Sequence, residues 1–230
     1  MSNLLNAEFY KLLHSQYLWV ITAFSLFLSS LLLLDSMEET SDLFFASLYN
    51  APILYFLVIV FATLFIGNDF KERTLQLYII AGHKRGQVLF VKLLAYQIAG
   101  TIILALPLIL HGFIGKIFLK ESIVNIDLST ILTISVSLFT MFLMPFFFAF
   151  LFRDIGKTLS VPLILFFLMI LLMNGDHALF LSKILPMGQL RLISLHPFAS
   201  SLIQFVLIDF LWIFILYMGA YWTFKRSDLK

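Results

Sequence analysis

The sequence predicts an all-helical integral membrane protein, with six membrane-spanning helices in a single domain that covers residues 1–230. Hydrophobic residues make up 61% of the chain, charged residues only 12%, and the mean hydropathy is +1.02. So little polar material cannot cover a water-soluble globule. The apolar runs also lack the alternating pattern that a membrane β-barrel requires. We therefore expect a helical bundle with lipid as its solvent.

Each span needs about 20 predominantly apolar residues, because the hydrocarbon core is about 30 Å thick and a helix rises about 1.5 Å per residue. The stretches that qualify are 17–34, 48–66, 90–114, 129–152, 159–173 and 202–224. The fifth stretch is short and begins near Pro162, which leaves its start the least defined of the six. Pro107 and Pro145 fall inside the third and fourth spans, where each removes a backbone hydrogen bond and favours a bend around a central cavity.

The basic residues predict that both termini lie in the cytoplasm. With that orientation, the inner segments hold Lys11, Lys71, Arg73, Lys84, Arg85, Lys92, Arg153, Lys157, Lys225, Arg226 and Lys230. The outer segments hold only Lys116, Lys120, Lys183 and Arg191. Inner loops of membrane proteins carry the excess of Lys and Arg, so this distribution fixes the orientation. A cleaved signal peptide is disfavoured, since the first apolar run is long and no small-residue cleavage site precedes Asp35.

The segment before the first span has its own helical pattern. Leu5, Phe9, Leu12 and Leu13 recur at helical spacing, which is typical of a helix that lies in the membrane interface. Two roles remain open for this helix: an anchor, or an element that transmits force.

Two further segments interrupt the apolar pattern. Residues 68–92 form a charged, amphipathic stretch between the second and third spans and carry five of the fifteen Lys and Arg residues. Residues 174–201, between the fifth and sixth spans, are apolar but broken by Pro186, Gly188 and Pro197. That second segment predicts short helices on the outer face or a re-entrant hairpin, either as a lid over an exit or as a cap on the bundle.

The sequence lacks the motifs of several enzyme classes. It has no GxxxxGK[ST] phosphate loop, no HExxH and no GxSxG motif, so nucleotide hydrolysis and these hydrolase chemistries have no support. It has no cysteine, and its five histidines are scattered, so we expect no metal site. Glu38 and Glu39 lack a histidine partner at helical spacing. The net charge of +2 follows topology and gives no reason to expect nucleic-acid binding.

One acidic residue falls inside a predicted span. Asp209 follows Gln204 in the last helix, and an intramembrane carboxylate is costly enough to mark a functional candidate. Asp209 and Gln204 are therefore candidates for a substrate path, on which Asp209 contacts a cationic substrate or a basic residue of a neighbouring helix. The alternative is that Asp209 lies shallowly among the lipid headgroups.

The order of these features resembles the permease subunit of an ABC-2 type transporter, in particular the small permeases of bacitracin or lantibiotic immunity and peptide export. The opening AEFYKLLHSQYLWVI places an acidic-aromatic pair and a lysine before the first span, as that family does. The second match is an acidic-aromatic pair, a Gly-Thr-Leu stretch, a basic turn and a lysine that opens the third span. These positions read Asp69-Phe70, Arg73-Thr74-Leu75, Ala81-Gly82-His83-Lys84-Arg85 and Lys92-Leu93. Arg73 departs from the family's glycine, and the basic tail FKRSDLK resembles the family's ending.

The resemblance implies a coupling helix within residues 68–92 that docks on a separate ATPase subunit, with ATP and Mg²⁺ bound there and no cofactor on this chain. It implies an assembly of two ATPase subunits with this chain and a second permease chain, the same or homologous, in a bacterial cytoplasmic membrane. The coupling residues that it implies are an apolar stripe with basic residues around it: Asp69, Phe70, Lys71, Arg73, Thr74, Leu77, Tyr78, Ala81, Lys84 and Arg85. The alternative for this segment is an interfacial helix on anionic lipid.

The resemblance also implies the class of substrate, a hydrophobic or cationic antimicrobial peptide, with a lipid or an amphiphilic drug as alternatives. Two other classes of protein remain open. One is a membrane-embedded enzyme or immunity protein that acts without ATP, and the other is a sensor that binds a partner through residues 68–92 but moves nothing.

Overall fold

A computed structural model describes residues 2–36, 40, 42–118, 127–174, 178–195 and 202–227. Its helices are α1 (Ser2–Leu13), α2 (Gln16–Ser36), α3 (Leu43–Ala62), the π-helical turn η1 (Thr63–Gly67), α4 (Asn68–Lys71), α5 (Thr74–Ile80), α6 (Arg85–Phe118), α7 (Leu128–Phe152), α8 (Ile155–Met173), α9 (Ala178–Ile184), α10 (Pro186–Leu195) and α11 (Leu202–Lys225). The described residues contain no strand. The all-helical prediction is confirmed.

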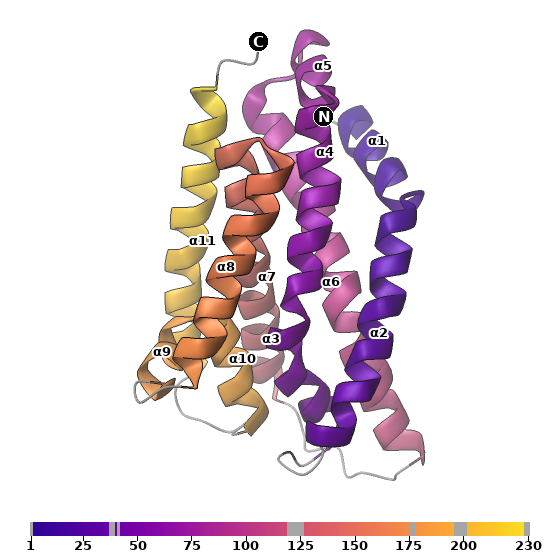
Figure 1. Ribbon diagram of the computed structural model, residues 1–230, viewed down its shortest axis with the longest axis vertical. Coiled ribbons are helices and arrows are strands. Elements are labelled where there is room, and N and C mark those ends of the chain that lie inside the picture. Colours follow the sequence, from indigo (N-terminus) through magenta and orange to yellow (C-terminus); the bar gives the residue numbers. More distant parts are fainter. Residues whose placement is uncertain are drawn as a thin grey trace.

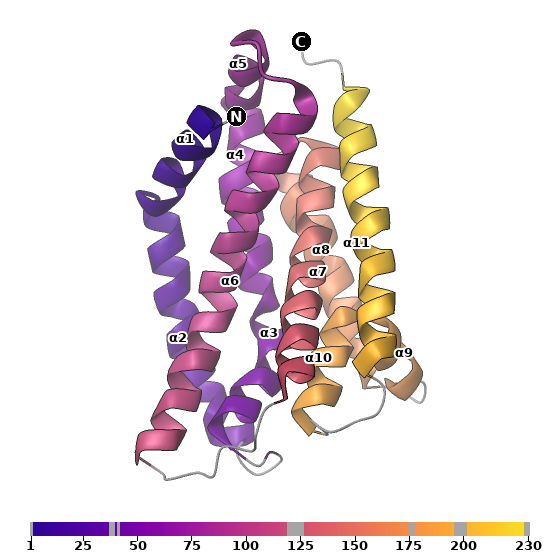
Figure 2. The ribbon, with the colours of Figure 1, turned by 180° about the vertical axis from the view of Figure 1, so that it is seen from behind.

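Six of these helical segments are long and apolar enough to span a membrane: 16–36, 43–71, 85–118, 128–152, 155–173 and 202–225. Each contains one predicted span and extends it by a few residues at one or both ends. Figures 1 and 2 show these helices side by side along the long axis of the molecule. The fold is that of a multi-pass, all-helical membrane protein.

The two ends of the bundle differ. α5 lies at one end together with α1 and the C-terminal end of α11, whereas α9 and α10 lie at the other (Figure 1). α6 and α7 run through Pro107 and Pro145 as continuous helices. We name the two ends of the bundle the α5 end and the hairpin end.

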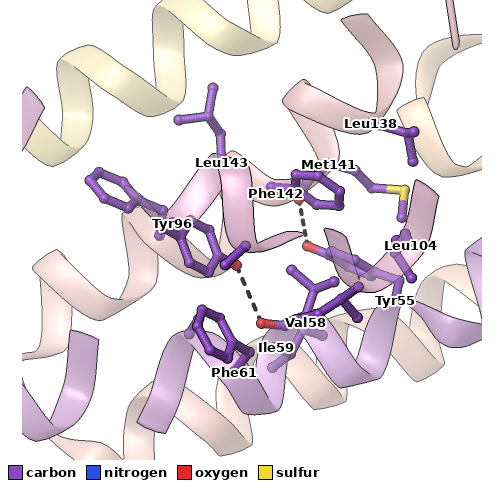
Figure 3. Close-up of a cluster of buried hydrophobic side chains, with 14 of the residues drawn as sticks. Tyr55, Val58, Ile59, Phe61, Tyr96, Leu104, Leu138, Met141, Phe142 and Leu143 are labelled. Atoms are coloured by element: carbon purple, nitrogen blue, oxygen red, sulfur yellow. Dashed lines mark hydrogen bonds between the residues drawn. The ribbon is translucent and has the colours of Figure 1, made fainter. Parts of the chain in front are cut away.

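The core of the bundle is built around α3, most of which is buried against α2, α6, α7 and α10. Two tyrosines tie its backbone to its neighbours: the Tyr55 hydroxyl donates to the Met141 carbonyl over 2.8 Å, and the Tyr96 hydroxyl donates to the Val58 carbonyl over 3.3 Å (Figure 3). Each bond satisfies a hydroxyl that would be costly to bury alone. Aromatic side chains fill the space around them, so this part of the core is apolar and both tyrosine hydroxyls are paired.

α7 bears the aromatic run of the sequence and distributes it over two surroundings. Phe142, Phe146 and Phe150 are fully buried in the core. Phe147 and Phe148 are only half-buried and line a cavity on the other side of the helix. Three of these rings therefore pack in the core, and two face the cavity.

The N-terminal helix is present but its buried face differs from the prediction. Leu4, Glu8 and Leu12, one turn apart, are buried against α6, while the predicted Leu13 is 51% exposed. Leu5 and Phe9 pack at the edge of the core. The face is rotated because Glu8 forms an ion pair inside the protein, which apolar spacing alone does not reveal.

Residues 174–201 contain two short helices that form a hairpin, α9 and α10, bent by 110° at Leu185. Gly188 makes this packing possible, because a Cβ atom there would lie 2.3 Å from the Cα atom of Ser182. α10 is largely buried against α3 and α7, so it enters the bundle rather than resting on its surface. Of the two predicted arrangements, the bent pair fits the re-entrant hairpin.

Candidate functional site

The site begins at the segment that connects α3 to α6. The π-helical turn η1 leads into α4 and adds a local irregularity directly before Asp69, and such π-turns are frequent at functional sites. A turn at Glu72 and Arg73 then separates α4 from α5. Arg73 has φ 59° and ψ 20°, the left-handed conformation that glycine adopts without steric cost. Glycine, which the family that the sequence resembles has at this position, would adopt this backbone conformation without strain.

The end of α5 is closed by a Schellman motif. The amide of His83 donates to the Tyr78 carbonyl over 3.1 Å, and that of Gly82 donates to the Ile79 carbonyl over 3.0 Å. Gly82 supplies the required left-handed conformation with φ 92°. Two defined turns thus hold the short helix α5 at its place beyond the ends of the spans (Figure 2).

An apolar tip is exposed on α5. Leu77 is 61% exposed, Ile80 is 80% exposed, and Ala81 is exposed beside them. Their spacing of three and four residues puts them on one helix face. We call Leu77, Ile80 and Ala81 the α5 tip. Three exposed basic residues flank α5 in the sequence: Lys71, Arg73 and Lys84.

The predicted coupling residues are divided by the structure. Leu77 and Ala81 belong to the α5 tip, and Thr74 begins α5 half-buried. Phe70 instead packs edge-on against Phe150 of α7, with ring centroids 5.3 Å apart. Asp69 is completely buried and offers no surface to a partner. Ile80 was missed, although its spacing from Leu77 in the sequence was sufficient to include it.

Four charged side chains form a buried ionic cluster at this end: Glu8 of α1, Lys11 of α1, Asp69 of α4 and Lys92 of α6. Lys92 lies between the two carboxylates, with its Nζ atom 2.7 Å from Glu8 Oε2 and in contact with Asp69. Lys11 pairs with the other oxygen of Asp69. The cluster is electrically neutral and joins three helical elements that are distant in the sequence.

Three of the four members are shielded from solvent, whereas the Lys11 side chain is 39% exposed, so the cluster is sensitive above all to the loss of a shielded member. The side chains of Glu8, Asp69 and Lys92 are at most 2% exposed, and Lys92 Nζ also lies 4.0 Å from the centre of the Phe65 ring. Removing one partner of a buried ion pair typically costs about 3–5 kcal/mol, because the other charge stays buried and unpaired. The ionic cluster therefore specifies one arrangement of α1, α4 and α6.

Tyr78 connects α5 to this cluster. Burial, followed by the negative charges of Glu8 and Asp69, raises the pKa of the Tyr78 phenol. The phenol consequently stays neutral at any physiological pH. Tyr78 is half-buried rather than exposed, so it faces the bundle and not the α5 tip.

Two arginines bind the C-terminal end of α11. Arg85 Nη1 donates to the carbonyls of Phe224, Lys225 and Ser227 over 3.1, 2.7 and 2.7 Å. Arg153 Nη2 donates to the Thr223 carbonyl over 2.9 Å. The last carbonyls of a helix lack partners within the helix and carry partial negative charge, so guanidinium groups satisfy both needs. Arg85, a predicted partner contact, is thus committed within the chain.

These contacts give the α5 segment three links to the bundle. α4 is tied to α1 and α6 by the ionic cluster, Phe70 packs on α7, and Arg85 holds α11 directly after the turn that follows α5. The segment that holds α5 therefore contacts α1, α6, α7 and α11.

A second candidate lies at the hairpin end. Asp209 of α11 is fully buried, and the Ser137 hydroxyl of α7 donates to its Oδ2 atom over 2.6 Å. Gln189 of α10 lies in the same group, with its Oε1 atom 3.1 Å from the Ser137 oxygen and its Nε2 atom donating to the Lys183 carbonyl. We call Ser137, Gln189 and Asp209 the polar triad. Asp209 is thus enclosed by protein rather than exposed on the surface of α11.

Gln204 does not join this triad. It is exposed, and it precedes Asp209 by five residues, which places it about 140° away around the helix. The structure therefore does not bring together the two residues predicted for a substrate path. Ser137 and Gln189 were missed by the sequence analysis, and nothing in their local sequence pointed to a shared site.

An apolar cavity of about 300 Å³ lies between α3, α7, α8, α11 and the hairpin. Its lining includes Tyr55 and Met141 at the core side, Trp212 and Ile215 of α11, and Met169 of α8. The Trp212 indole donates to the Ile184 carbonyl at the bend of the hairpin over 3.1 Å. Ile215 is 52% exposed and Met169 half-buried, so the cavity opens between α8 and α11.

The remaining predicted features add no third site. Among the described residues, no group of three or more His, Asp or Glu could hold a metal ion. Glu38, Glu39, His177, His196, Lys120 and Lys230 lie outside the described residues.

Comparison with known proteins gives no assignment. The chain matches none of the protein-family models against which it was compared, and no curated protein matches it in sequence. What the fold defines is the class: a multi-pass helical membrane protein with a protruding amphipathic segment at one end and a buried polar triad at the other.

Proposed function

We propose that this chain is the transmembrane permease subunit of an ATP-driven exporter whose ATPase is a separate chain. The observation that carries the proposal is the α5 tip: an exposed apolar face on a short helix that exposed basic residues flank in the sequence. The residues directly before and after this helix contact α1, α6, α7 and α11. An apolar face of this kind is energetically unfavourable in water and is typical of a surface that a partner covers. The sequence contains no phosphate loop, so the nucleotide site must belong to the partner.

The proposal includes an orientation and a location. The α5 end carries ten of the described basic residues, from Lys11 to Arg226, whereas the hairpin end carries Lys116, Lys183 and Arg191. The positive-inside rule then puts the α5 end and both termini in the cytoplasm and the hairpin outside. A bacterial cytoplasmic membrane, a second permease chain and two ATPase subunits complete the assembly implied by the family resemblance.

The proposed cargo is a hydrophobic or antimicrobial peptide, exported or removed to confer immunity. This part rests on the family resemblance and on the presence of an apolar cavity that opens between α8 and α11. An intramembrane enzyme is the alternative, because the hydroxyl oxygens of Ser47 and Ser30 each lie 3.1 Å from a ring nitrogen of His111. It is less favoured, because the sequence has no GxSxG motif.

Photocrosslinking at the α5 tip tests the partnership. The crosslinking amino acid p-benzoylphenylalanine replaces Ile80 in one variant and Ile109, which is 65% exposed on the lipid-facing part of α6, in a matched control. After irradiation of native-host membranes, we expect position 80 to capture a chain with a GxxxxGK[ST] motif and position 109 to capture none. Adding Leu77→Asp to the position-80 variant should remove that product, because a buried carboxylate opposes the apolar contact.

Other products distinguish the alternatives. Crosslinks from position 80 to phospholipid alone indicate an interfacial helix on the membrane. Crosslinks to a protein without a nucleotide site indicate a sensor. Either result overturns the proposed coupling to an ATPase.

A further inference from the structure

Asp209 lacks a cationic partner among the residues that the structure describes, although it is completely buried. Its Oδ2 atom accepts from Ser137, but its Oδ1 atom has no hydrogen-bond partner. The two basic residues of the hairpin do not neutralise it. Lys183 is exposed, and Arg191 donates to Asn174 and Tyr49 on the other side of α10. A carboxylate in such surroundings requires either a proton or a bound cation.

Two members of the polar triad lie one helical turn from residues that line the apolar cavity, although none of the three lines it directly. Ser137 precedes the cavity-lining Thr140 by one turn of α7, and Asp209 precedes the cavity-lining Trp212 by one turn of α11. On α10, Met187 lines the cavity, and Gln189 lies about 200° further around the helix, on the side of Ser137. α7 and α11 both run from the hairpin end toward the α5 end, so the triad sits at the hairpin-side end of the cavity (Figure 1).

We propose that the cavity and Asp209 together form a binding site for a cationic amphiphile, with the apolar body of the ligand in the cavity and its primary ammonium or guanidinium group on Asp209. The cavity is lined by apolar and aromatic side chains without any charged residue, which suits an alkyl chain or an aromatic ring. A charged donor on a buried carboxylate forms the stronger kind of hydrogen bond. Ser137 and Gln189 hold the carboxylate in place.

The dimensions limit the ligand. A volume of about 300 Å³ is at the small end of binding sites, so it accommodates one hydrocarbon chain or one aromatic side chain. The opening between α8 and α11 faces the lipid, so the ligand enters from the bilayer. This inference relies on the proposed export function only for the statement that the bound molecule is cargo. Binding itself is a property of this chain and is measured without any ATPase.

Fluorescence quenching of Trp212 tests the site directly. The chain has three tryptophans, and replacing the exposed Trp19 and Trp222 by Phe leaves Trp212, which lines the cavity, as the sole reporter. The purified permease in dodecyl maltoside is titrated with two probes of equal chain length, mid-chain brominated dodecylamine and mid-chain brominated dodecanol. The amine is protonated at neutral pH and the alcohol is not.

We expect the amine to quench at a concentration at least tenfold lower than the alcohol. Asp209→Asn should abolish this preference, because it removes the charge and keeps the shape. Asp154→Asn is the matched control: Asp154 is exposed and caps α8 at the other end of the bundle, so the preference should persist. Ile215→Phe, which fills part of the cavity, should weaken both probes.

Three results would overturn the proposal: equal quenching by amine and alcohol in the unaltered site, an amine preference that survives Asp209→Asn, or no effect of Ile215→Phe on either probe. The first comparison needs no variant at Asp209, so it decides even where Asp209→Asn folds poorly. A negative result here leaves the crosslinking of the α5 tip unaffected, so failure of this inference and failure of the proposed function are distinguished.

Discussion

Replacing Lys92 by Met should destabilise the protein by about 3–5 kcal/mol, since the substitution leaves the carboxylates of Glu8 and Asp69 buried without their shared cation. Met is close to Lys in length and can fill the space that the Lys92 side chain occupies beside the Phe65 ring. The packing loss is therefore small, and the charge term dominates. For a chain of this size the loss corresponds to a fall in the unfolding midpoint on the order of 10 °C.

The measurement is thermal unfolding of the purified protein in a nonionic detergent, with Lys71→Met as the matched control. Lys71 is exposed on α4, only two residues from Asp69, and makes no ion pair among the described residues. Its substitution should change the free energy of unfolding by less than about 0.5 kcal/mol. A second arm combines Lys92→Met with Glu8→Gln and Asp69→Asn, which removes the uncompensated charges and should restore most of the lost stability.

Equal midpoints for Lys92→Met and Lys71→Met would refute the reasoning, because they would show that the ionic cluster contributes nothing beyond an exposed lysine. If the triple variant does not regain stability, the loss of stability in Lys92→Met comes from packing rather than from unpaired charge.

Three further predictions address the turn, the helix end and the orientation. Arg73→Gly should raise the free energy of unfolding, measured by thermal unfolding, by about 1 kcal/mol, because the left-handed conformation at φ 59° costs a non-glycine residue about that much. Lys71→Gly is the control and should lower the free energy of unfolding, because Lys71 lies within a helix. Arg85→Gln should accelerate hydrogen exchange at the end of α11, because three carbonyls lose their charged donor, while exchange in α2 stays unchanged. Cysteine at Lys183 should react with an impermeant thiol reagent from outside sealed cells and cysteine at Lys84 should not, since both side chains are exposed at opposite ends; the reverse pattern would invert the proposed orientation.

The spans could be read from the sequence because they depend on local composition. A helix in lipid must satisfy all its backbone groups internally, so an apolar run of sufficient length specifies both its conformation and its place. The same argument located the hairpin, since Pro186 and Gly188 interrupt a run that is otherwise apolar. Boundaries moved by a few residues, because polar residues at the ends of spans continue the helix into the interface.

The buried polar side-chain pairs could not be predicted from the sequence in the same way. Glu8 and Lys92 are 84 positions apart, and Ser137 and Asp209 are 72 apart, so no periodicity links them. Apolar spacing on α1 predicted a buried face that excludes Glu8. The ion pair of Glu8 instead turns the face of Leu4, Glu8 and Leu12 toward the bundle. Asp209 was recognised as costly, but its depth depends on α10, whose entry into the bundle only the tertiary structure reveals.

α11 connects the two candidate sites physically. Its C-terminal carbonyls are held by Arg85, which begins α6 directly after the turn that follows α5, and by Arg153. Its Asp209 belongs to the polar triad at the hairpin end, about 22 Å from Phe224 at 1.5 Å per residue. The intervening helix has no break and packs along α7, so it behaves as a rigid element over that length. One continuous helix therefore joins the arginine contacts at the α5 end to the contact between Asp209 and Ser137 at the hairpin end.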